Sequence, residues 1–288
     1  MAPRGFYSLI PAVRGNWSRP DHRSFYGTLS QKITIYRPIV LFFKVLIMDS
    51  TQHAVLTDTE HPPVLIQPRN TQPRENAMTK PYAKLDKNNA AVLLVDHQAG
   101  LLSLVRDFQP DQFKNNVLAL GDLAKYFKLP TILTTSFEQG PNGPLVQELK
   151  DQFPDAPYIA RPGQINAWDN EDFVKAVKAT GKKQLIIAGV VTEVCVAFPA
   201  LAALEEGFDV FVVTDASGTF NEVTRNAAWD RMSQAGAQLM SWFGVACELH
   251  RDWRNDVEGL GTLFANHIPD YRNLMASYSA VQAASQGK

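Results

Sequence analysis

Cys195 is the residue of this sequence whose type and position most directly indicate a reactive side chain. It lies in residues 184–198, QLIIAGVVTEVCVAF, where an apolar run stops at Gly189 and resumes with a helical pattern. This pattern predicts a strand, a tight turn and a helix start, with Thr192 as the N-cap. A thiol in the first helical turn lies at the positive end of the helix dipole, where it ionises more easily and becomes nucleophilic. The alternative is that Cys195 is one more small buried residue.

Asp96 and Arg161 could supply an acid and a cation to this thiol. Asp96 directly follows residues 90–95, AAVLLV, a continuous apolar run typical of a strand covered on both faces. Open α/β sheets bind ligands at the carboxyl ends of their strands, although an acid there can equally cap the next turn. Arg161 lies in a Pro- and Gly-bearing loop at residues 155–168. At one sheet edge, the acid could take the thiol proton while the cation stabilised both anions. The predicted chemistry is attack by sulfur on an electrophilic carbon, then hydrolysis of a covalent intermediate.

The segments that must position these residues alternate between strand and helix patterns. Strands are expected at residues 90–95, 131–135, 185–188, 209–214 and 237–240. Helices are expected at residues 111–126, 144–150, 170–180, 192–206, 221–235 and 271–284, with Gly181 as a C-cap and a further helical region at residues 242–265. This alternation predicts an α/β fold, a three-layer doubly wound domain with a mostly parallel central sheet flanked by helices.

Residues 1–77 differ in composition from the rest of the chain. They carry nine Lys or Arg and five Asp or Glu, about +4, which leaves nineteen and twenty-four, about −5, for residues 78–288. Their apolar run at residues 33–48 is interrupted by charges and a proline and is shorter than the roughly 20 residues that cross a bilayer. We expect residues 1–77 to be a disordered or non-native N-terminal extension, with a transit peptide as the alternative, and residues 78–288 to form the folded domain.

Composition and missing motifs argue against several functions. A net charge of −1 without basic–aromatic clusters disfavours nucleic acid binding. The sequence has no GxGxxG after a strand, no phosphate-binding P-loop, no CxxC and no HExxH, so nucleotide cofactors and a local metal motif are not supported. Two cysteines in 288 residues do not form a disulfide framework, which fits a reducing, cytoplasmic location. Of the two, Cys247 is interpreted as a buried structural thiol.

Three segments together resemble the isochorismatase-like cysteine hydrolases, which include nicotinamidases, N-carbamoylsarcosine amidases and YcaC-type hydrolases. They are AAVLLVDHQ around Asp96, ARPGQINAW around Arg161, and GVVTEVC ending at Cys195. The sequence is most similar to the YcaC-type branch, over about residues 80–275. The acid and thiol motifs together are quite specific to the family, whereas the loop segment alone would be weak evidence for membership.

The resemblance implies Asp96 as the general base, Cys195 as the nucleophile and Arg161 in place of the family lysine. It also implies a cis peptide bond between Val190 and Val191, and an oxyanion site formed by the backbone of Val190, Val191 and Cys195. An arginine keeps its proton where a lysine could donate one. We still expect it to orient the acid and to lower the pKa of Cys195.

The resemblance also bears on cofactors and on the pocket. Zinc-bearing nicotinamidases carry an Asp-Trp-His-like motif where this sequence has TSFEQG at residues 135–140, which argues against a metal and against nicotinamide as the substrate. No cofactor is expected. His97, Asn166 and Trp168 are candidates for lining the substrate pocket, with packing in the core as the alternative for His97 and Trp168.

Three functions remain open from the sequence. The first is a cofactor-independent hydrolase that acts on a small-molecule amide or other C–N bond through a thioester-type intermediate. The second is an oligomeric assembly or binding protein of the same fold with little turnover. The family's YcaC-like members form stacked rings, so a homo-oligomer such as a ring-like octamer is expected, and the apolar region at residues 242–278 is consistent with a subunit interface. The third is a redox-active thiol. Neither nucleic acid nor membrane partners are expected.

Overall fold

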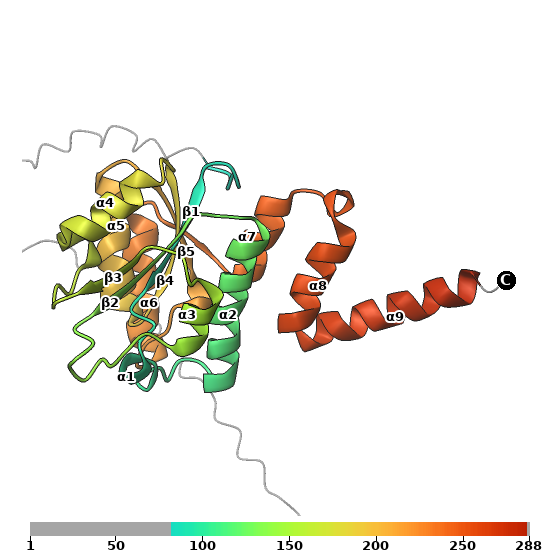
Figure 1. Ribbon diagram of the computed structural model, residues 1–288, viewed down its shortest axis with the longest axis horizontal. Helices are drawn as coiled ribbons and strands as arrows, with labels where there is room; N and C mark the ends of the chain where they lie inside the picture. The colour runs from blue at the N-terminus through green and yellow to red at the C-terminus, as the bar shows by residue number, and fades with distance from the viewer. Residues whose placement is uncertain (1–81, 287–288) are drawn as a thin grey trace, which may run out of the picture. The chain divides into compact units, whose positions relative to one another are not determined.

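One parallel sheet organises the part of the chain that the structure describes. The structure is a computed structural model that describes residues 82–286 (Figure 1), so the expectation for residues 1–77 lies outside the described part. Six strands, all parallel to their neighbours, lie in the order β3-β2-β1-β4-β5-β6. They are β1 (Ala90–Val95), β2 (Thr131–Ser136), β3 (Tyr158–Arg161), β4 (Gln184–Gly189), β5 (Asp209–Val213) and β6 (Gln238–Met240). The predicted doubly wound α/β class is confirmed.

Helices connect and follow these strands. The α-helices of the described part are α1 (Ala99–Leu102), α2 (Pro110–Tyr126), α3 (Gln147–Gln152), α4 (Glu171–Ala179), α5 (Ala197–Glu205), α6 (Glu222–Gln234), α7 (Trp242–His250), α8 (Val257–His267) and α9 (Pro269–Gln286). Short helical turns are η1 (Ala167–Asp169), η2 (Thr192–Val196), η3 (Thr214–Ala216) and η4 (Trp253–Asn255). No helix among residues 82–286 combines the length and the apolar content needed to cross a membrane.

The two faces of the sheet are buried by different helices. Because side chains alternate across a strand, Val92 and Leu94 of β1 join a core with α2, α7 and α8. Leu93 and Val95 join a second core with α4, α5 and α6. Figure 1 shows α4, α5 and α6 on one side of the sheet, with α2 and α7 on the other. All six β1 residues are buried, which explains its unbroken apolar sequence.

The strand order changes direction between β1 and β4. From β1 the chain adds β2 and β3 on one side, then crosses over and adds β4, β5 and β6 on the other. A crevice forms outside the carboxyl ends of the two strands at such a switch point, and it is the usual ligand site of this architecture. Asp96 follows β1 and Cys195 lies six residues after the end of β4. The topology therefore brings both residues to the same point.

Two local expectations were wrong. Arg161 is not in a loop but is the last residue of β3, a four-residue strand whose first three side chains are not buried. Thr192 does not cap an α-helix, because residues 192–196 form a π-helical turn and α5 begins only at Ala197. The side-chain oxygen of Thr192 is buried without a hydrogen-bond partner among the described residues. Cys195 therefore lies in this π turn rather than in a first α-helical turn.

Gly189 at the end of β4 leaves no room for a side chain beside β1. A Cβ atom there would collide with the carbonyl oxygen of Val95 and would lie 3.1 Å from the Val95 Cβ. We expect Gly189→Ala to lower the free energy of unfolding by about 1–3 kcal/mol, the usual cost of overpacking. The measurement is urea denaturation. Gly163→Ala is the matched control, since no atom of the described chain lies within 4 Å of the position that its Cβ would take. Equal stability of the two variants would contradict the close approach.

Candidate active site

A buried ion pair between Asp96 and Arg161 forms the base of the candidate site. One guanidinium nitrogen of Arg161 donates to Asp96 Oδ1, and both side chains are completely buried. Arg161 reaches Asp96 across the end of β2, where its Nε donates to Thr134 Oγ1 at 3.0 Å. Its other terminal nitrogen donates to the carbonyl oxygens of Gln164 and Ile165. The guanidinium is therefore held from three sides in one position.

Cys195 is the second partner of the Asp96 carboxylate. The thiol and the carboxylate lie close enough to shift each other's pKa, and both side chains are buried. Asp96 Oδ2 is buried without a hydrogen-bond partner among the described residues. Burial raises the pKa of Asp96, while the neighbouring Arg161 opposes this rise. Burial also raises the pKa of Cys195, and the Asp96 carboxylate raises it further. The expectation of an easily ionised thiol was therefore wrong, because burial and the Asp96 carboxylate outweigh the Val191 amide and Arg161.

The backbone turn before Cys195 presents an amide to the sulfur. The peptide bond between Val190 and Val191 is cis, as the resemblance implies. The Val191 N–H interacts with the Cys195 thiol and lowers its pKa, although less than burial raises it. The Val190 N–H instead donates to the Val95 carbonyl at 3.2 Å. Val190 is thus engaged in the sheet, which leaves Val191 and Cys195 as the candidate oxyanion donors.

A polar network outside the triad fixes the same turn. The Thr192 N–H donates to the Gly218 carbonyl at 3.0 Å. Glu193 Oε2 accepts a hydrogen bond from the Thr219 hydroxyl at 2.6 Å. The Thr219 N–H in turn donates to Asp107 Oδ1 at 2.9 Å. Thr192 and Glu193 thus attach the turn to the segment after η3, and Thr219 links that segment to the loop before α2.

His97 and Asn166 have structural partners. His97 is buried, and its Nε2 lies 3.1 Å from the Ala216 carbonyl. Burial lowers the pKa of His97 to about 4, so the imidazole is neutral at physiological pH. The Asn166 side chain accepts from the Trp168 N–H and donates to Asp169, which caps η1. Both side chains are therefore engaged in contacts that stabilise the fold around the site.

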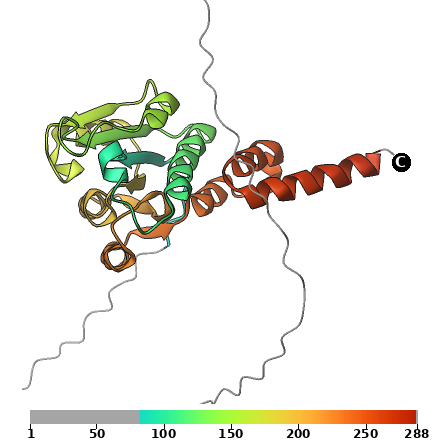
Figure 2. The ribbon, with the colours of Figure 1, turned by 90° about the horizontal axis from the view of Figure 1, so that it is seen from below.

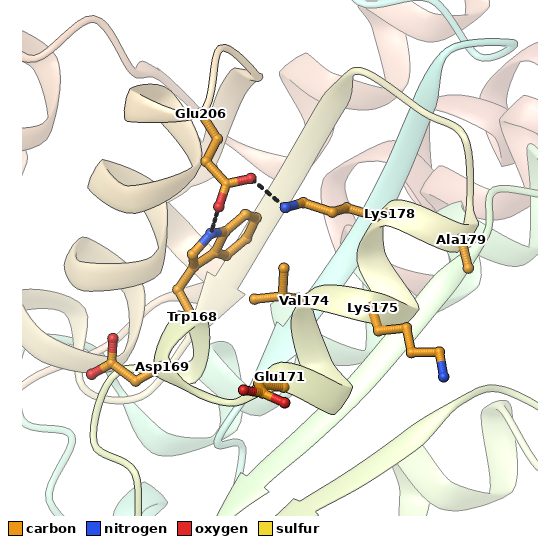
Figure 3. Close-up of a pocket in the computed structure, with 8 residues that line it drawn as sticks. All are labelled: Trp168, Asp169, Glu171, Val174, Lys175, Lys178, Ala179 and Glu206. Carbon is orange, nitrogen blue, oxygen red and sulfur yellow. Dashed lines mark hydrogen bonds and ion pairs between the residues drawn. The ribbon is translucent and has the colours of Figure 1, made fainter.

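Trp168 lies in η1, which packs against α4 and α5, and not beside Asp96, Arg161 and Cys195. Its ring packs against Phe173 and Phe208, and its indole N–H donates to Glu206 at 2.8 Å. Figure 3 shows Trp168 beside Glu206 and Lys178 in an open groove of about 630 Å³. None of Asp96, Arg161 and Cys195 lines this groove. The structure therefore brings together the three predicted catalytic side chains, but it does not bring Trp168 to them.

Thr134 and Gln98 support the site and were missed from the sequence. Thr134 accepts from Arg161 Nε, as described, and Gln98 accepts from the Ser136 N–H at 2.8 Å and donates to the Ser136 carbonyl. Both side chains are fully buried. Their polar character inside otherwise apolar surroundings was the available signal, because buried polar groups need partners. Among the described residues, no three His, Cys, Asp or Glu side chains gather as a metal site.

The fold and the buried residues together define a class of protein. It is a parallel α/β domain with an acid, a cation and a thiol at the switch point of its sheet. Residues 90–243, 154 of the 288 residues, match the isochorismatase domain. The chain belongs to the isochorismatase family.

Individual relatives are very similar to the chain. It is 87% identical to the probable hydrolase YcaC of Escherichia coli over 204 residues, which cover 71% of this chain and 98% of the relative. The crystal structure of that E. coli protein, described as an octameric hydrolase of unknown specificity, matches with a TM-score of 0.69 over 70% of this chain and 100% of its own. YcaC from Pseudomonas aeruginosa, solved with hexane-2,5-diol and covalent acrylamide, is 78% identical, with a TM-score of 0.68 over 69% of this chain and 98% of its own.

Arg161 is predicted to be required for stability because Asp96 is buried beside it. Arg161→Ala would leave the carboxylate without its cation, and we expect a loss of about 3–5 kcal/mol in the free energy of unfolding at pH 7. Urea denaturation at fixed protein concentration measures it. Arg161→Lys is the control, since it keeps the charge but loses the planar fork that reaches Thr134, and a smaller loss is expected. An alanine variant as stable as wild type would show that the pair is not coupled in the folded protein.

Proposed function

We propose that this protein is a cofactor-independent cysteine hydrolase that cleaves a small amide or related C–N bond. The observation that supports this most strongly is the direct contact of the Cys195 thiol with the buried Asp96 carboxylate, which Arg161 holds in place. One oxygen of this carboxylate is buried without a hydrogen-bond partner, so it is free to accept the proton of the neighbouring thiol. Burial raises the pKa of Asp96, which makes this carboxylate a stronger base than an exposed one.

The first half of the proposed reaction forms a covalent intermediate. Asp96 takes the thiol proton as the Cys195 sulfur attacks the carbonyl carbon of the amide. The carbonyl oxygen becomes an oxyanion, which the Val191 and Cys195 amides are proposed to stabilise. Protonated Asp96 then gives its proton to the departing nitrogen. The C–N bond breaks, the amine leaves, and the acyl group stays on sulfur as a thioester.

The second half returns the enzyme to its starting state. Asp96, again ionised, removes a proton from a water molecule that attacks the thioester carbon. The C–S bond breaks, the thiol regains the proton from Asp96, and a carboxylic acid is released. Overall, one amide and one water give one acid and one amine. Arg161 keeps its proton throughout and stabilises the carboxylate form of Asp96.

Exposed apolar residues whose backbones adjoin the site suggest the character of the substrate. Phe137 and Ile165 are exposed, and their backbones contact Arg161: the Phe137 N–H donates to the Arg161 carbonyl, and the Ile165 carbonyl accepts from the guanidinium. Phe220, also exposed, directly follows Thr219 of the network that fixes the nucleophile turn. These neighbours support a small substrate with an apolar group next to the reacting amide.

The relatives support a reactive nucleophile and an assembly. Acrylamide is a small electrophilic amide, and its covalent attachment in the P. aeruginosa relative is in keeping with a nucleophilic side chain in that protein. The E. coli relative is an octamer, and we propose that this chain forms the same type of homo-oligomer. Both cysteines here are free, which suits a reducing compartment such as the cytoplasm. An assembly protein with little turnover is the second candidate, and the octameric relative is the observation that favours it.

Turnover of a panel of small amides tests the proposal. We expect wild type to release amine and carboxylic acid, Cys195→Ala to lose this activity, and Asp96→Asn to lose about 10²–10⁴-fold. Mass spectrometry of the acid-quenched reaction should find the acyl group on the Cys195 peptide. Cys247→Ser is the matched control and should retain wild-type turnover, because Cys247 on α7 packs on the core of one sheet face and Cys195 belongs to the core of the other.

Two results would contradict the proposed hydrolase function. If Cys195→Ala released product as fast as wild type, the thiol would not be the nucleophile. If wild type formed no acyl adduct and hydrolysed no member of the panel while assembling normally, the assembly function would take precedence.

A further inference from the structure

A cavity at the amino edge of the sheet collects three lysines. It has a volume of about 600 Å³, within the range of small-molecule sites, and Lys87, Lys128 and Lys182 line it. These lysines lie shortly before the adjacent strands β1, β2 and β4, so the parallel sheet brings all three to one edge. Asp96 follows the opposite end of β1, a six-residue strand about 20 Å long. The cavity is therefore separate from the candidate active site.

The charges around this cavity favour an anion. None of the three lysines forms an ion pair within residues 82–286. The Lys182 ammonium donates to the Asn88 carbonyl at 2.8 Å, which leaves two of its three protons for other partners. Asp256 is the one carboxylate in the lining, and it already accepts from the Tyr126 hydroxyl at 2.7 Å and from the Gly259 N–H at 2.8 Å. Three cations thus face one occupied anion.

His250 brings a polar atom without a partner to the same cavity. Its side chain lines the cavity and packs beside the rings of Tyr126, Phe127 and Trp253. Figures 1 and 2 both show α2, which carries Tyr126, beside α7, which carries His250. His250 is only 7% exposed, and its Nε2 is buried without a hydrogen-bond partner among the described residues. Buried polar groups are usually satisfied, so this nitrogen indicates a partner that a ligand would supply.

Lys128 holds a backbone position that glycine would also satisfy. It follows the end of α2 with a φ of 55°, the left-handed conformation that ends many helices and that glycine adopts without steric cost. The Leu129 N–H donates to the Ala124 carbonyl at 2.8 Å and closes the helix end. The helix end therefore does not require the lysine side chain, which is exposed and available to a ligand.

A phosphate group is the anion that fits these residues. It carries about −1.5 to −2 charges at neutral pH and has three strong acceptor oxygens, whereas a carboxylate has one charge and two oxygens. Several ammonium groups and an imidazole donor match the phosphate in charge and in number of donors. We propose that this cavity binds a small molecule through its phosphate group. The three lysines neutralise the phosphate, and the His250 ring, rotated toward the cavity, donates to it from Nε2. Binding here is independent of the chemistry at Cys195.

Calorimetric titration of the full-length protein with inorganic pyrophosphate tests the proposal. We expect Lys182→Ala and Lys128→Gly each to weaken binding on the order of tenfold. Lys183→Ala is the matched control and should bind as wild type does, because it removes the same charge from the next residue, which does not line the cavity. Lys128→Gly keeps the helix end, so its loss of binding would not reflect misfolding. Malonate, a dicarboxylate, should bind much more weakly than pyrophosphate at the same ionic strength.

Lysine acetylation of unmodified protein locates the ligand without any variant. Acetic anhydride labels exposed lysines, and peptide mass spectrometry follows each one. Saturating pyrophosphate should slow the labelling of Lys87, Lys128 and Lys182 but not of Lys183. The proposal would be overturned by absence of binding at millimolar pyrophosphate, by malonate binding as tightly, by equal weakening in Lys183→Ala, or by unchanged labelling of the three lysines. Amide turnover by Cys195 is measured separately without pyrophosphate, so failure of one proposal does not decide the other.

Discussion

The buried ion pair of Asp96 and Arg161 is the interaction on which the rest of the site depends. A carboxylate without solvent contact is costly unless a cation and hydrogen bonds replace its hydration. Arg161 provides this replacement at one carboxylate oxygen and leaves the other without a hydrogen-bond partner. A lysine would place a single point charge there, whereas the guanidinium also contacts Thr134 and two carbonyl groups. The arginine at this position is thus accompanied by a matching set of partners.

Sheet topology explains why this pair meets the thiol. β1 and β4 are the central neighbours at which the strand order reverses, and their carboxyl ends deliver Asp96 and the turn that holds Cys195. Gly189 allows the two strands to approach closely at this point. Arg161 comes from β3 and must extend past β2 to reach the acid. One acid, one thiol and one long cation are therefore brought to the same edge by three separate strands.

Much of this arrangement could be predicted from the sequence, because burial leaves a clear pattern. The unbroken apolar run of β1 and the periodic apolar residues of α2 indicated the layers, and strand ends indicated where Asp96 and Cys195 meet. β3 was missed because a four-residue edge strand with exposed side chains has no apolar run. The pKa of Cys195 was predicted in the wrong direction because burial is a property of the folded chain, not of the local motif. The π turn likewise depends on contacts with distant segments, such as the Thr192–Gly218 hydrogen bond.

The most direct test of coupling between Asp96 and Cys195 is the rate at which iodoacetamide labels Cys195 between pH 6 and 9. It is followed by peptide mass spectrometry in wild type and in Asp96→Asn, with Cys247 as the internal reference. Asp96 raises the pKa of Cys195, so if it were only a neighbouring charge, its removal would increase the thiolate fraction and speed labelling. If Asp96 accepts the proton, its removal slows labelling at neutral pH. We predict slowing on the order of 10²-fold. Labelling of Asp96→Asn that is as fast as wild type, or faster, would contradict the role of Asp96 as the base.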